Sequence, residues 1–399
     1  MQQCGLAAPF RKGRDLDPQI HVPRLLRCRT YGSVLELTVE TRRGQTIEEL
    51  NTAAPKLAAS LRAATYRVRP AQGRRAGYST VIELVMHDSL TAPVQAAAAS
   101  PLPTYDKVTL GRGQSGATWQ LVVRGRHTLI AGCSGAGKGS VLWGLCCGLS
   151  PAVRRDLVRL WGVDLKRGVE LQMGAGLFSA AAYNPRDALA VLKSLLQVID
   201  ERGTKMAGHS RLHQPRPGDP LHVLVIDELA ALTAYSDITI RRDAERLLSE
   251  ILTQGRALGV VVVACVQDPR KDVVPMRGLF TQTVALRLRS IEETVMVLGE
   301  GAAAIAPAHR ISPRAPGTAW IVDDTGAVDR VRADYWPDEV IAAVATTNRA
   351  NVLVELPAND NLDDFAGDGE WDVVSPRRPR TPRKPREMSL VAPIGGDDE

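Results

Sequence analysis

The sequence predicts an α/β protein whose main domain is built on a mostly parallel sheet, and three observations carry this prediction. Short runs rich in Val, Ile and Leu alternate with helical patterns over residues 106–345, as in strands buried on both faces and covered by helices. A glycine-rich turn, Gly132 to Lys138, follows one of these runs and precedes a helical pattern. Two carboxylates, Asp227 and Glu228, end another run.

A small α+β module is predicted over residues 20–90, after a flexible N-terminus at 1–19. Residues 34–41, VLELTVET, alternate apolar and polar side chains, as expected of a half-buried strand. Thr46, with Glu49 three positions later, has the pattern of a capping box that begins a helix. Two further strand-like runs, TYRVR at 65–69 and YSTVIELVM at 78–86, complete the module.

The main domain is expected at 106–345, after an Ala- and Pro-rich linker at 91–105. Helical spacing of apolar residues predicts helices in PRDALAVLKSLLQVIDERGTKM and in RRDAERLLSEILTQGRALG. The predicted strands are the runs HTLIAG, VRLWGVD, LHVLVIDE, GVVVVACVQ, TVALRLR and TAWIVD.

The tail at 346–399 changes in character and is predicted to be disordered. It is acidic first and then alternates Pro with Arg, and prolines at this density prevent helices and sheet ladders. Its basic part, 377–386, has two interpretations: it binds DNA or acidic protein surfaces, or it only keeps the chain in solution.

Composition and charge favour an anionic partner and a reducing compartment. Net charge is +6, which leans toward nucleic acid. The six cysteines form no Cys-x-x-Cys pair and are interpreted as small buried residues of a cytoplasmic protein. The N-terminus lacks the apolar core of a signal peptide and no run is long enough to cross a membrane, so any membrane attachment is expected to come through a partner protein.

The stretch GCSGAGKGS has the spacing of a phosphate-binding loop. A strand, a glycine-rich turn and a helix direct backbone N–H groups to one point, where phosphates bind, and Lys138 would reach the β- and γ-phosphates. The predicted nucleotide-binding residues are Gly132, Cys133, Ser134, Gly135, Ala136, Gly137, Lys138, Gly139 and Ser140.

Gly139 departs from this pattern, because the loop normally carries Ser or Thr there as a Mg²⁺ ligand. Ser140, one residue later, is rotated roughly 100° around the helix. Either Ser140 substitutes through a shifted turn, or water fills the position and Asp227 holds the metal. We expect a working site.

Buried strands are predicted to deliver three polar side chains to one edge of the sheet. Asp227 would hold the water shell of Mg²⁺, and Glu228 would orient and deprotonate the attacking water. The alternative is an acidic strand end that only caps the next helix. Gln267, at the end of the neighbouring run, would sense the γ-phosphate or simply terminate a strand.

Two smaller patterns accompany these motifs. His209 and His213 have a spacing that can bind zinc on a helix, but the surrounding Pro and Gly residues indicate a surface loop. Cys133 could make the phosphate loop sensitive to oxidation, although a space-filling role is the default.

In their order, these motifs resemble the FtsK/SpoIIIE family of DNA-pumping ATPases, and its plasmid-transfer relatives in particular. The likeness covers about residues 107–325. VTLGRGQSGATWQLVV is similar to the hairpin before the loop, HTLIAGCSGAGKG to HLLVAGxTGSGKS, and GVDLKRGVEL to the DPK segment. VLVIDELAAL is similar to VVVDEFADL, and TQGRALGVVVVACVQDP to ARAAGIHLVLATQRP, although Asp268 stands where the family usually has Arg.

The resemblance implies a RecA-like motor fold, a hexameric ring around double-stranded DNA, and ATP hydrolysis with Mg²⁺ between neighbouring subunits. It makes Arg256 the candidate for the arginine that reaches a neighbour's γ-phosphate, with Arg287 and Arg289 as rivals. The module at 20–90 is similar only in position to the family's non-motor module. No winged-helix module that reads orientation sequences is expected, because the Pro-rich, acidic tail cannot bury such a core.

The predicted function is therefore ATP-dependent translocation of double-stranded DNA, in conjugative plasmid or mobile-element transfer or in chromosome segregation. Two alternatives stay open. One is a nucleotide-binding scaffold that Gly139 has made unable to hydrolyse ATP. The other is a coupling ATPase that hands single-stranded DNA to a secretion channel.

Overall fold

The computed structural model describes residues 5–10, 19–71, 77–96, 98, 101–270, 273–322 and 328–356. The chain divides into two units, Met1–Asn359 and Asp360–Glu399, and the second lies outside the described residues. The prediction of disorder for 346–399 therefore falls outside the described part except at positions 346–356. No helix among the described residues is long and apolar enough to span a membrane.

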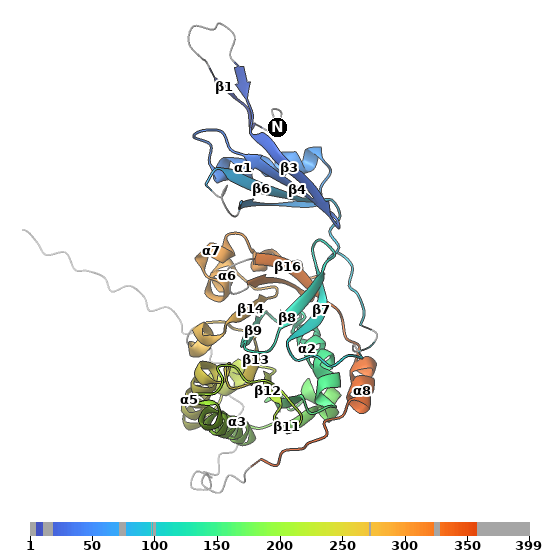
Figure 1. The fold of residues 1–399 in the computed structure, drawn as a ribbon, viewed down its shortest axis with the longest axis vertical. Helices are drawn as coiled ribbons and strands as arrows, with labels where there is room; N and C mark the ends of the chain where they lie inside the picture. The colour runs from blue at the N-terminus through green and yellow to red at the C-terminus, as the bar shows by residue number, and fades with distance from the viewer. Residues whose placement is uncertain are drawn as a thin grey trace, which may run out of the picture. The chain divides into compact units, whose positions relative to one another are not determined.

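The N-terminal part contains a four-stranded antiparallel sheet and one helix (Figure 1). Strand order is β3-β4-β6-β5, and a further two-stranded pair, β1 and β2, precedes it. The element bounds are β1 Ala8–Phe10, β2 Gln19–His21, β3 Arg24–Tyr31, β4 Val34–Glu40, α1 Ile47–Ser60, β5 Thr65–Pro70 and β6 Ser79–Val85.

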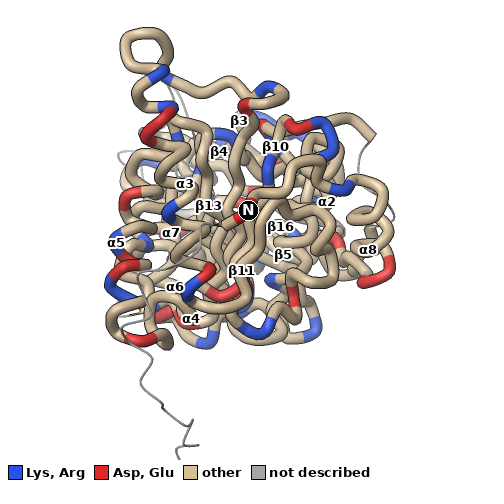
Figure 2. The backbone as a smooth tube through the Cα atoms, turned by 90° about the horizontal axis from the view of Figure 1, so that it is seen from below, with Lys and Arg blue, Asp and Glu red and all other residues tan. Residues whose placement is uncertain are grey.

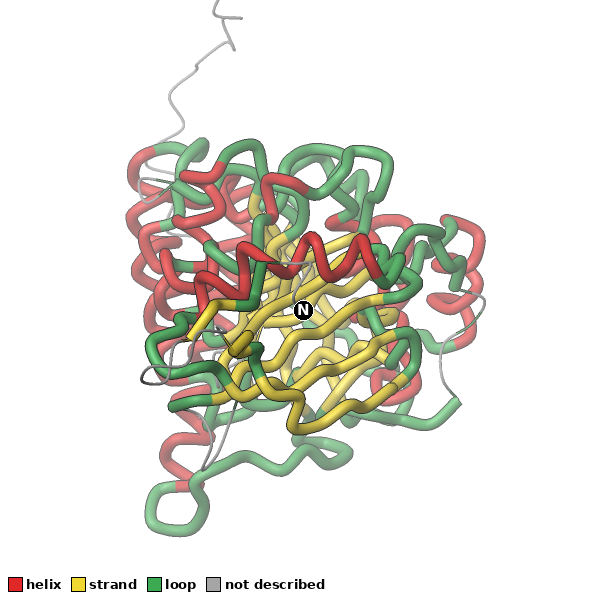
Figure 3. The backbone as a smooth tube through the Cα atoms, turned by 90° about the horizontal axis from the view of Figure 1, so that it is seen from above, coloured by secondary structure: helices red, strands yellow, loops and turns green. Residues whose placement is uncertain are grey.

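Helix α1 begins as its capping pattern predicts and lies across this small sheet (Figure 3). The Thr46 hydroxyl accepts a hydrogen bond from the Glu49 N–H at 3.3 Å. Leu50 and Leu57 of α1 share a core with Leu37 of β4 and Ile82 of β6. The sequence analysis missed β3, because RLLRCRTY carries exposed side chains in place of a clear alternation.

The main domain holds a ten-stranded sheet with the order β11-β10-β12-β13-β9-β14-β15-β16-β7-β8. Pairing is parallel from β11 to β14 and antiparallel from β14 to β8. The strands are β7 Lys107–Gly113, β8 Thr118–Val122, β9 Thr128–Ala131, β10 Val158–Val163, β11 Phe178–Ala182, β12 Leu221–Ile226, β13 Val260–Val266, β14 Gln282–Ala285, β15 Thr318–Val322 and β16 Val328–Ala333.

Two hydrophobic cores lie on opposite faces of the parallel strands, which confirms the predicted α/β fold (Figure 1). Val223 and Val225 of β12 belong to one core, with α2 and α8, whereas Leu224 and Ile226 belong to the other, with α3 and α5. Successive side chains of a strand point to opposite faces, so a strand buried on both sides is continuously apolar. These helices are α2 Lys138–Val153, α3 Pro185–Met206, α5 Ile238–Gln254 and α8 Asp338–Thr347.

The end of the described chain packs against the main domain. Helix α8 runs through Thr347, past the predicted boundary at 345. Ala350 is buried, and the Val354 N–H donates to the Ser179 carbonyl of β11 at 2.8 Å. The remaining elements are short: η3 Leu171–Leu177, α4 Leu229–Thr233, η4 Pro275–Leu279, α6 Ile291–Leu298, α7 Glu300–Ala303 and η5 Ala308–Arg310.

Candidate functional site

The phosphate loop joins the end of β9, in the interior of the sheet, to the start of α2. Gly135 and Gly137 have φ values of 69° and 97°, a region that favours glycine. A Cβ on Gly137 would stand 2.2 Å from the backbone nitrogen of Gly317, which itself donates to the Ala136 carbonyl at 2.9 Å. Glycine is therefore required by close backbone approach as well as by φ.

Lys138 is folded back over the loop that precedes it. Its ammonium donates to the carbonyls of Gly132 at 2.9 Å and Cys133 at 3.3 Å. Burial lowers its pKa, and the nearby carboxylates of Glu228 and Asp227 oppose that effect. Cys133 is buried, in agreement with a space-filling side chain. The ammonium is thus held inside the loop that would surround a phosphate.

Asp227 and Glu228 follow β12 directly, at the same edge of the sheet as the phosphate loop, because β12, β13 and β9 are parallel neighbours. Their side chains are 13% and 5% exposed, and burial raises the pKa of Asp227. Glu228 accepts a hydrogen bond at Oε1 from the backbone N–H of Gln267 at 3.2 Å. The fold therefore brings these three residues and Lys138 to one edge.

Lys166 joins this group, and the sequence analysis assigned it no role. Its ammonium lies 3.2 Å from Glu228 Oε2 and 3.5 Å from Asp227 Oδ2. Burial lowers the pKa of Lys166, but the charges of Asp227 and Glu228 outweigh it and the net shift is upward. The two carboxylates thus share one ammonium.

Asp164, which follows β10, organises the loop that carries Lys166. This fully buried carboxylate accepts from the backbone N–H of Lys166 at 3.0 Å, of Glu170 at 3.0 Å and of Leu171 at 3.1 Å. Arg167 and Gly168 both have positive φ, so the loop turns sharply between its anchored ends. The sequence offered one signal for Asp164, since this acidic residue directly follows a buried apolar run.

Glu170 lies beside the start of α2. Its Oε1 accepts from the indole N–H of Trp143 at 2.8 Å, and a Cβ on Gly139 would stand 2.7 Å from the same oxygen. Gly139, Ser140 and Glu170 line a cavity of about 500 Å³. Other walls of this cavity come from the loop glycines and the C-terminal part of the domain, including Gly135, Gly137, Arg314, Pro316, Trp336 and Asp338.

The three predicted arginines lie in different places. Arg287 is in contact with its own phosphate loop, since its guanidinium donates to the Ser134 carbonyl at 3.0 Å. Arg289 follows on the same segment and is exposed. Arg256 is exposed between α5 and β13, at the edge where the parallel strands begin, and its charge lowers the pKa of His127 there. Arg256 therefore does not reach the phosphate loop of its own chain.

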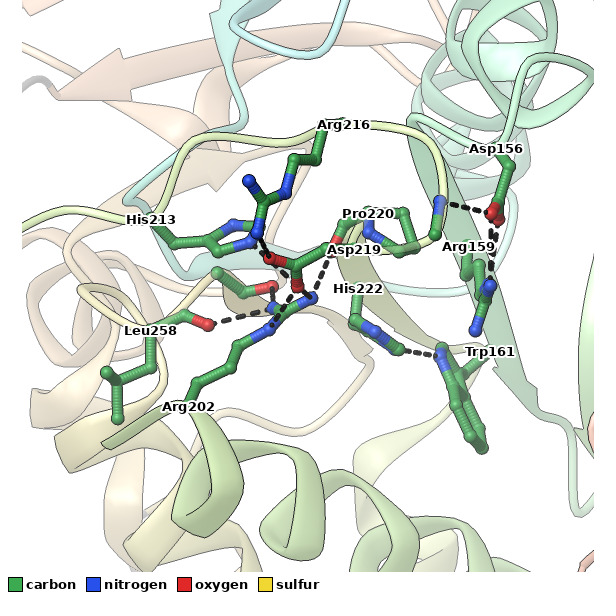
Figure 4. Close-up of polar contacts among 12 residues, drawn as sticks. Asp156, Arg159, Trp161, Arg202, His213, Arg216, Asp219, Pro220, His222 and Leu258 are labelled. Carbon is green, nitrogen blue, oxygen red and sulfur yellow. Dashed lines mark hydrogen bonds and ion pairs between the residues drawn. The ribbon is translucent and has the colours of Figure 1, made fainter. Parts of the chain in front are cut away.

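A buried polar cluster lies at that same starting edge of the sheet, away from the phosphate loop (Figure 4). Arg202 of α3 donates to Asp219 at 3.0 Å and to the carbonyls of Leu258 and Pro220 at 2.9 and 2.6 Å. His213 Nε2 is 3.1 Å from Asp219, and the side chain is only 4% exposed. His209 and His213 therefore lie in a loop, as predicted, but the His213 side chain is buried beside Asp219 and does not face the surface.

The chain is similar to known proteins over most of its length. Residues 106–300 match the FtsK/SpoIIIE family model. The chain is 27% identical over 369 residues to the transfer protein TraSA of Streptomyces ambofaciens, covering 84% of this chain and 86% of that protein. It is 30% identical over 213 residues to a sporulation regulatory protein of Streptomyces azureus, covering 50% and 70%.

Longer relatives and solved structures match as well. The DNA translocase FtsK of Corynebacterium glutamicum is 28% identical over 251 residues, and the match covers only 26% of that protein. The structure of the pCW3 conjugation coupling protein TcpA, a monomer form with ATPγS, superposes with a TM-score of 0.54 at 18% identity over 82% of this chain and 94% of that one. The fold is therefore shared with TcpA. The family model covers the phosphate loop and the ends of β10, β12 and β13, and the chain belongs to the FtsK/SpoIIIE family.

Proposed function

We propose that the chain is an ATP-hydrolysing motor that moves double-stranded DNA in conjugative transfer. One observation carries the proposal: Lys138, Asp227 and Glu228 converge at the edge of the sheet where the phosphate loop opens. A transfer role is supported by the match to the Streptomyces transfer protein, which extends over 84% of this chain and 86% of the relative, well beyond the motor motifs.

In this proposal the phosphates of ATP bind the loop N–H groups, and the Lys138 ammonium leaves the loop carbonyls to contact the β- and γ-phosphates. The cavity of about 500 Å³ beside the loop receives the rest of the nucleotide. Glu228 orients and deprotonates the attacking water, and Gln267 is close enough to respond to the γ-phosphate because its N–H bonds Glu228.

Magnesium fits the oxygen donors at this edge of the sheet. Asp227 supplies a carboxylate directly after β12, and Ser140 lines the cavity beside the phosphate loop. Among the described residues no three Asp, Glu, His or Cys side chains form a ready-made metal site. We therefore propose that Mg²⁺ is held by one or two carboxylates together with water and the nucleotide phosphates, as is usual for this ion. When bound, the ion would neutralise charge on the phosphates.

We propose that the chain assembles into a ring, a hexamer, in which each subunit supplies an arginine to the γ-phosphate bound by its neighbour. Arg256 lies away from its own phosphate loop, so its proposed contact with a γ-phosphate requires a neighbouring subunit. Lys and Arg lie among Asp and Glu along the backbone (Figure 2), and the net charge is +6, which favours an anionic partner. In the proposed ring we expect DNA to be held by phosphate contacts. Such binding would depend on salt more than on DNA sequence.

The test is ATP turnover by the native chain and by Glu228→Gln, with duplex DNA, with single-stranded DNA and without DNA. A motor on double strands gives turnover that rises with duplex and is lost in the variant. Preferential stimulation by single strands would instead support a coupling ATPase. A second candidate, the non-hydrolysing scaffold, is favoured by Gly139 at the position of a hydroxyl ligand. It predicts bound ATP, assembled protein and no turnover above that of the variant.

A further inference from the structure

The Glu170 carboxylate occupies the space where a side chain at residue 139 would lie. The residue after the loop lysine normally carries a hydroxyl that faces the metal, and here it has no side chain. The space into which that side chain would project is filled by the carboxylate of Glu170. Its Oε1, Cδ and Oε2 atoms stand 2.7, 3.5 and 3.8 Å from a Cβ built on Gly139. An oxygen donor is therefore present at this point, delivered from another segment.

Glu170 is fixed from two directions, so its carboxylate position is well determined. The indole N–H of Trp143, one turn into α2, donates to Oε1 at 2.8 Å. The backbone N–H of Glu170 donates to buried Asp164 at 3.0 Å. Oε2 accepts no hydrogen bond from any residue in the described ranges, and the side chain lines the cavity next to Gly139 and Ser140. One carboxylate oxygen is thus anchored while the other stays available.

The Glu170 carboxylate offers an oxygen donor to a cation. It lines the cavity beside Gly139 and Ser140, and carboxylate oxygens are ligands that Mg²⁺ uses in proteins. Lys166 forms ion pairs with Asp227 and Glu228, whereas no ion pair to Glu170 is found among the described residues.

We propose that Glu170 is a Mg²⁺ ligand of the nucleotide site and takes the place of the hydroxyl that Gly139 lacks. This inference rests on the proposed ATP binding. It replaces the two explanations based on sequence alone, a shifted Ser140 or an additional water. It also accounts for glycine at residue 139, since a Cβ there would require the Glu170 carboxylate to shift from its present position.

The experiment measures binding of ATPγS to the full chain as Mg²⁺ is varied, and follows bound Mn²⁺ by its EPR spectrum as a second readout. Glu170→Gln keeps an acceptor for Trp143 but has no charge, and Glu170→Ala removes the group. Both should raise the half-saturating Mg²⁺ concentration by about tenfold or more, a size typical of lost metal-site groups. Binding of ATPγS without metal should change less than about threefold, because the loop and Lys138 stay intact.

A swap variant makes the test specific. Gly139→Ser alone should weaken Mg²⁺ binding, because its Cβ meets Glu170. Gly139→Ser combined with Glu170→Ala has space for the hydroxyl and should recover Mg²⁺ binding to within about threefold of the native chain, as one hydroxyl replaces one carboxylate oxygen. Asp338→Asn removes a charge from the same cavity and serves as the control, with a shift below about twofold expected from screening alone.

The outcomes separate this inference from the proposed function. Three outcomes would overturn the role of Glu170 while leaving ATP binding in place. The half-saturating Mg²⁺ concentration could be native in both Glu170 variants, it could shift equally in Asp338→Asn, or it could fail to recover in the swap variant. Absence of ATPγS binding by the native chain would overturn the proposed function and the inference together. Thermal unfolding of each variant identifies a lost fold, and Glu170→Gln then decides the result because it retains the Trp143 contact.

Discussion

The ammonium of Lys166 lies between two carboxylates and is closer to Glu228, at 3.2 Å, than to Asp227, at 3.5 Å. The residue proposed to activate water therefore rests in an ion pair, anchored on its other oxygen by the Gln267 N–H. Removing the ammonium leaves two neighbouring carboxylates without a counter-charge.

Lys166→Met should lower ATP turnover by about tenfold at neutral pH and move the acid limb of the pH–rate profile upward. The direction follows because Lys166 lowers the pKa of Asp227, so loss of this positive charge leaves Asp227 protonated to a higher pH. Lys166→Arg keeps the charge and should keep the native limb. A pH–rate profile for each protein checks this, and an unmoved limb in Lys166→Met would exclude an electrostatic role.

Asp164→Asn should destabilise the chain by about 1–3 kcal/mol, because one amide oxygen cannot replace a carboxylate that accepts three backbone N–H groups in a buried position. Denaturant unfolding measures the loss. The same variant should weaken Mg²⁺-dependent nucleotide binding, since the loop that carries Lys166 and Glu170 loses its anchor. If Asp164→Asn unfolds with the same free energy as the native chain, the loop keeps its shape without this carboxylate.

Buried histidines should make stability fall below about pH 6.5. His127 accepts the Val262 N–H at Nδ1, and burial followed by the charge of Arg256 lowers its pKa to about 4. The folded state keeps this ring neutral while the unfolded chain takes up a proton, so unfolding free energy falls as pH drops from 6.5 to 4. The neutral His127 ring contributes about 3 kcal/mol to this pH dependence of the unfolding free energy, and its contribution does not change with pH above 6.5.

Urea unfolding at pH 7 and pH 5 checks this expectation, and His127→Gln should reduce the difference. His222 adds to the same trend, because burial holds its pKa well below the usual value and Trp161 donates to its Nδ1 at 2.9 Å. Equal stability at the two pH values would contradict the assignment of neutral buried rings.

Mixing two inactive variants should restore turnover if Arg256 acts on a neighbour. In a mixed ring of Arg256→Ala and Glu228→Gln subunits, some interfaces combine an intact Glu228 with an intact Arg256. We expect recovery of up to about a quarter of native turnover with DNA, as random pairing provides. Arg287 contacts the phosphate loop of its own chain. Turnover by Arg287→Ala should therefore recover on mixing with Glu228→Gln only if Arg287 also acts on a neighbour. No recovery with Arg256→Ala would remove Arg256 from that role.

Much of the site could be predicted because its residues follow strands. Asp227, Glu228 and Gln267 end continuous apolar runs, and parallel strands bring such ends to one edge. Lys166 and Glu170 could not be placed this way. Their positions depend on a loop shaped by Asp164 and by positive φ at Arg167, which no periodicity reports. Strand β11, FSAAA, was missed because its small residues lack a strand signal.

The close contact between Gly137 and Gly317 links the phosphate loop to the antiparallel half of the sheet. Gly317 precedes β15, donates to Ala136 of the phosphate loop and accepts from Ala333 of β16, both at 2.9 Å. Neither glycine has a side chain that could deform and absorb a displacement. A displacement of the phosphate loop would therefore be passed directly to β15 and β16, which couples the loop stiffly to the antiparallel strands of the sheet.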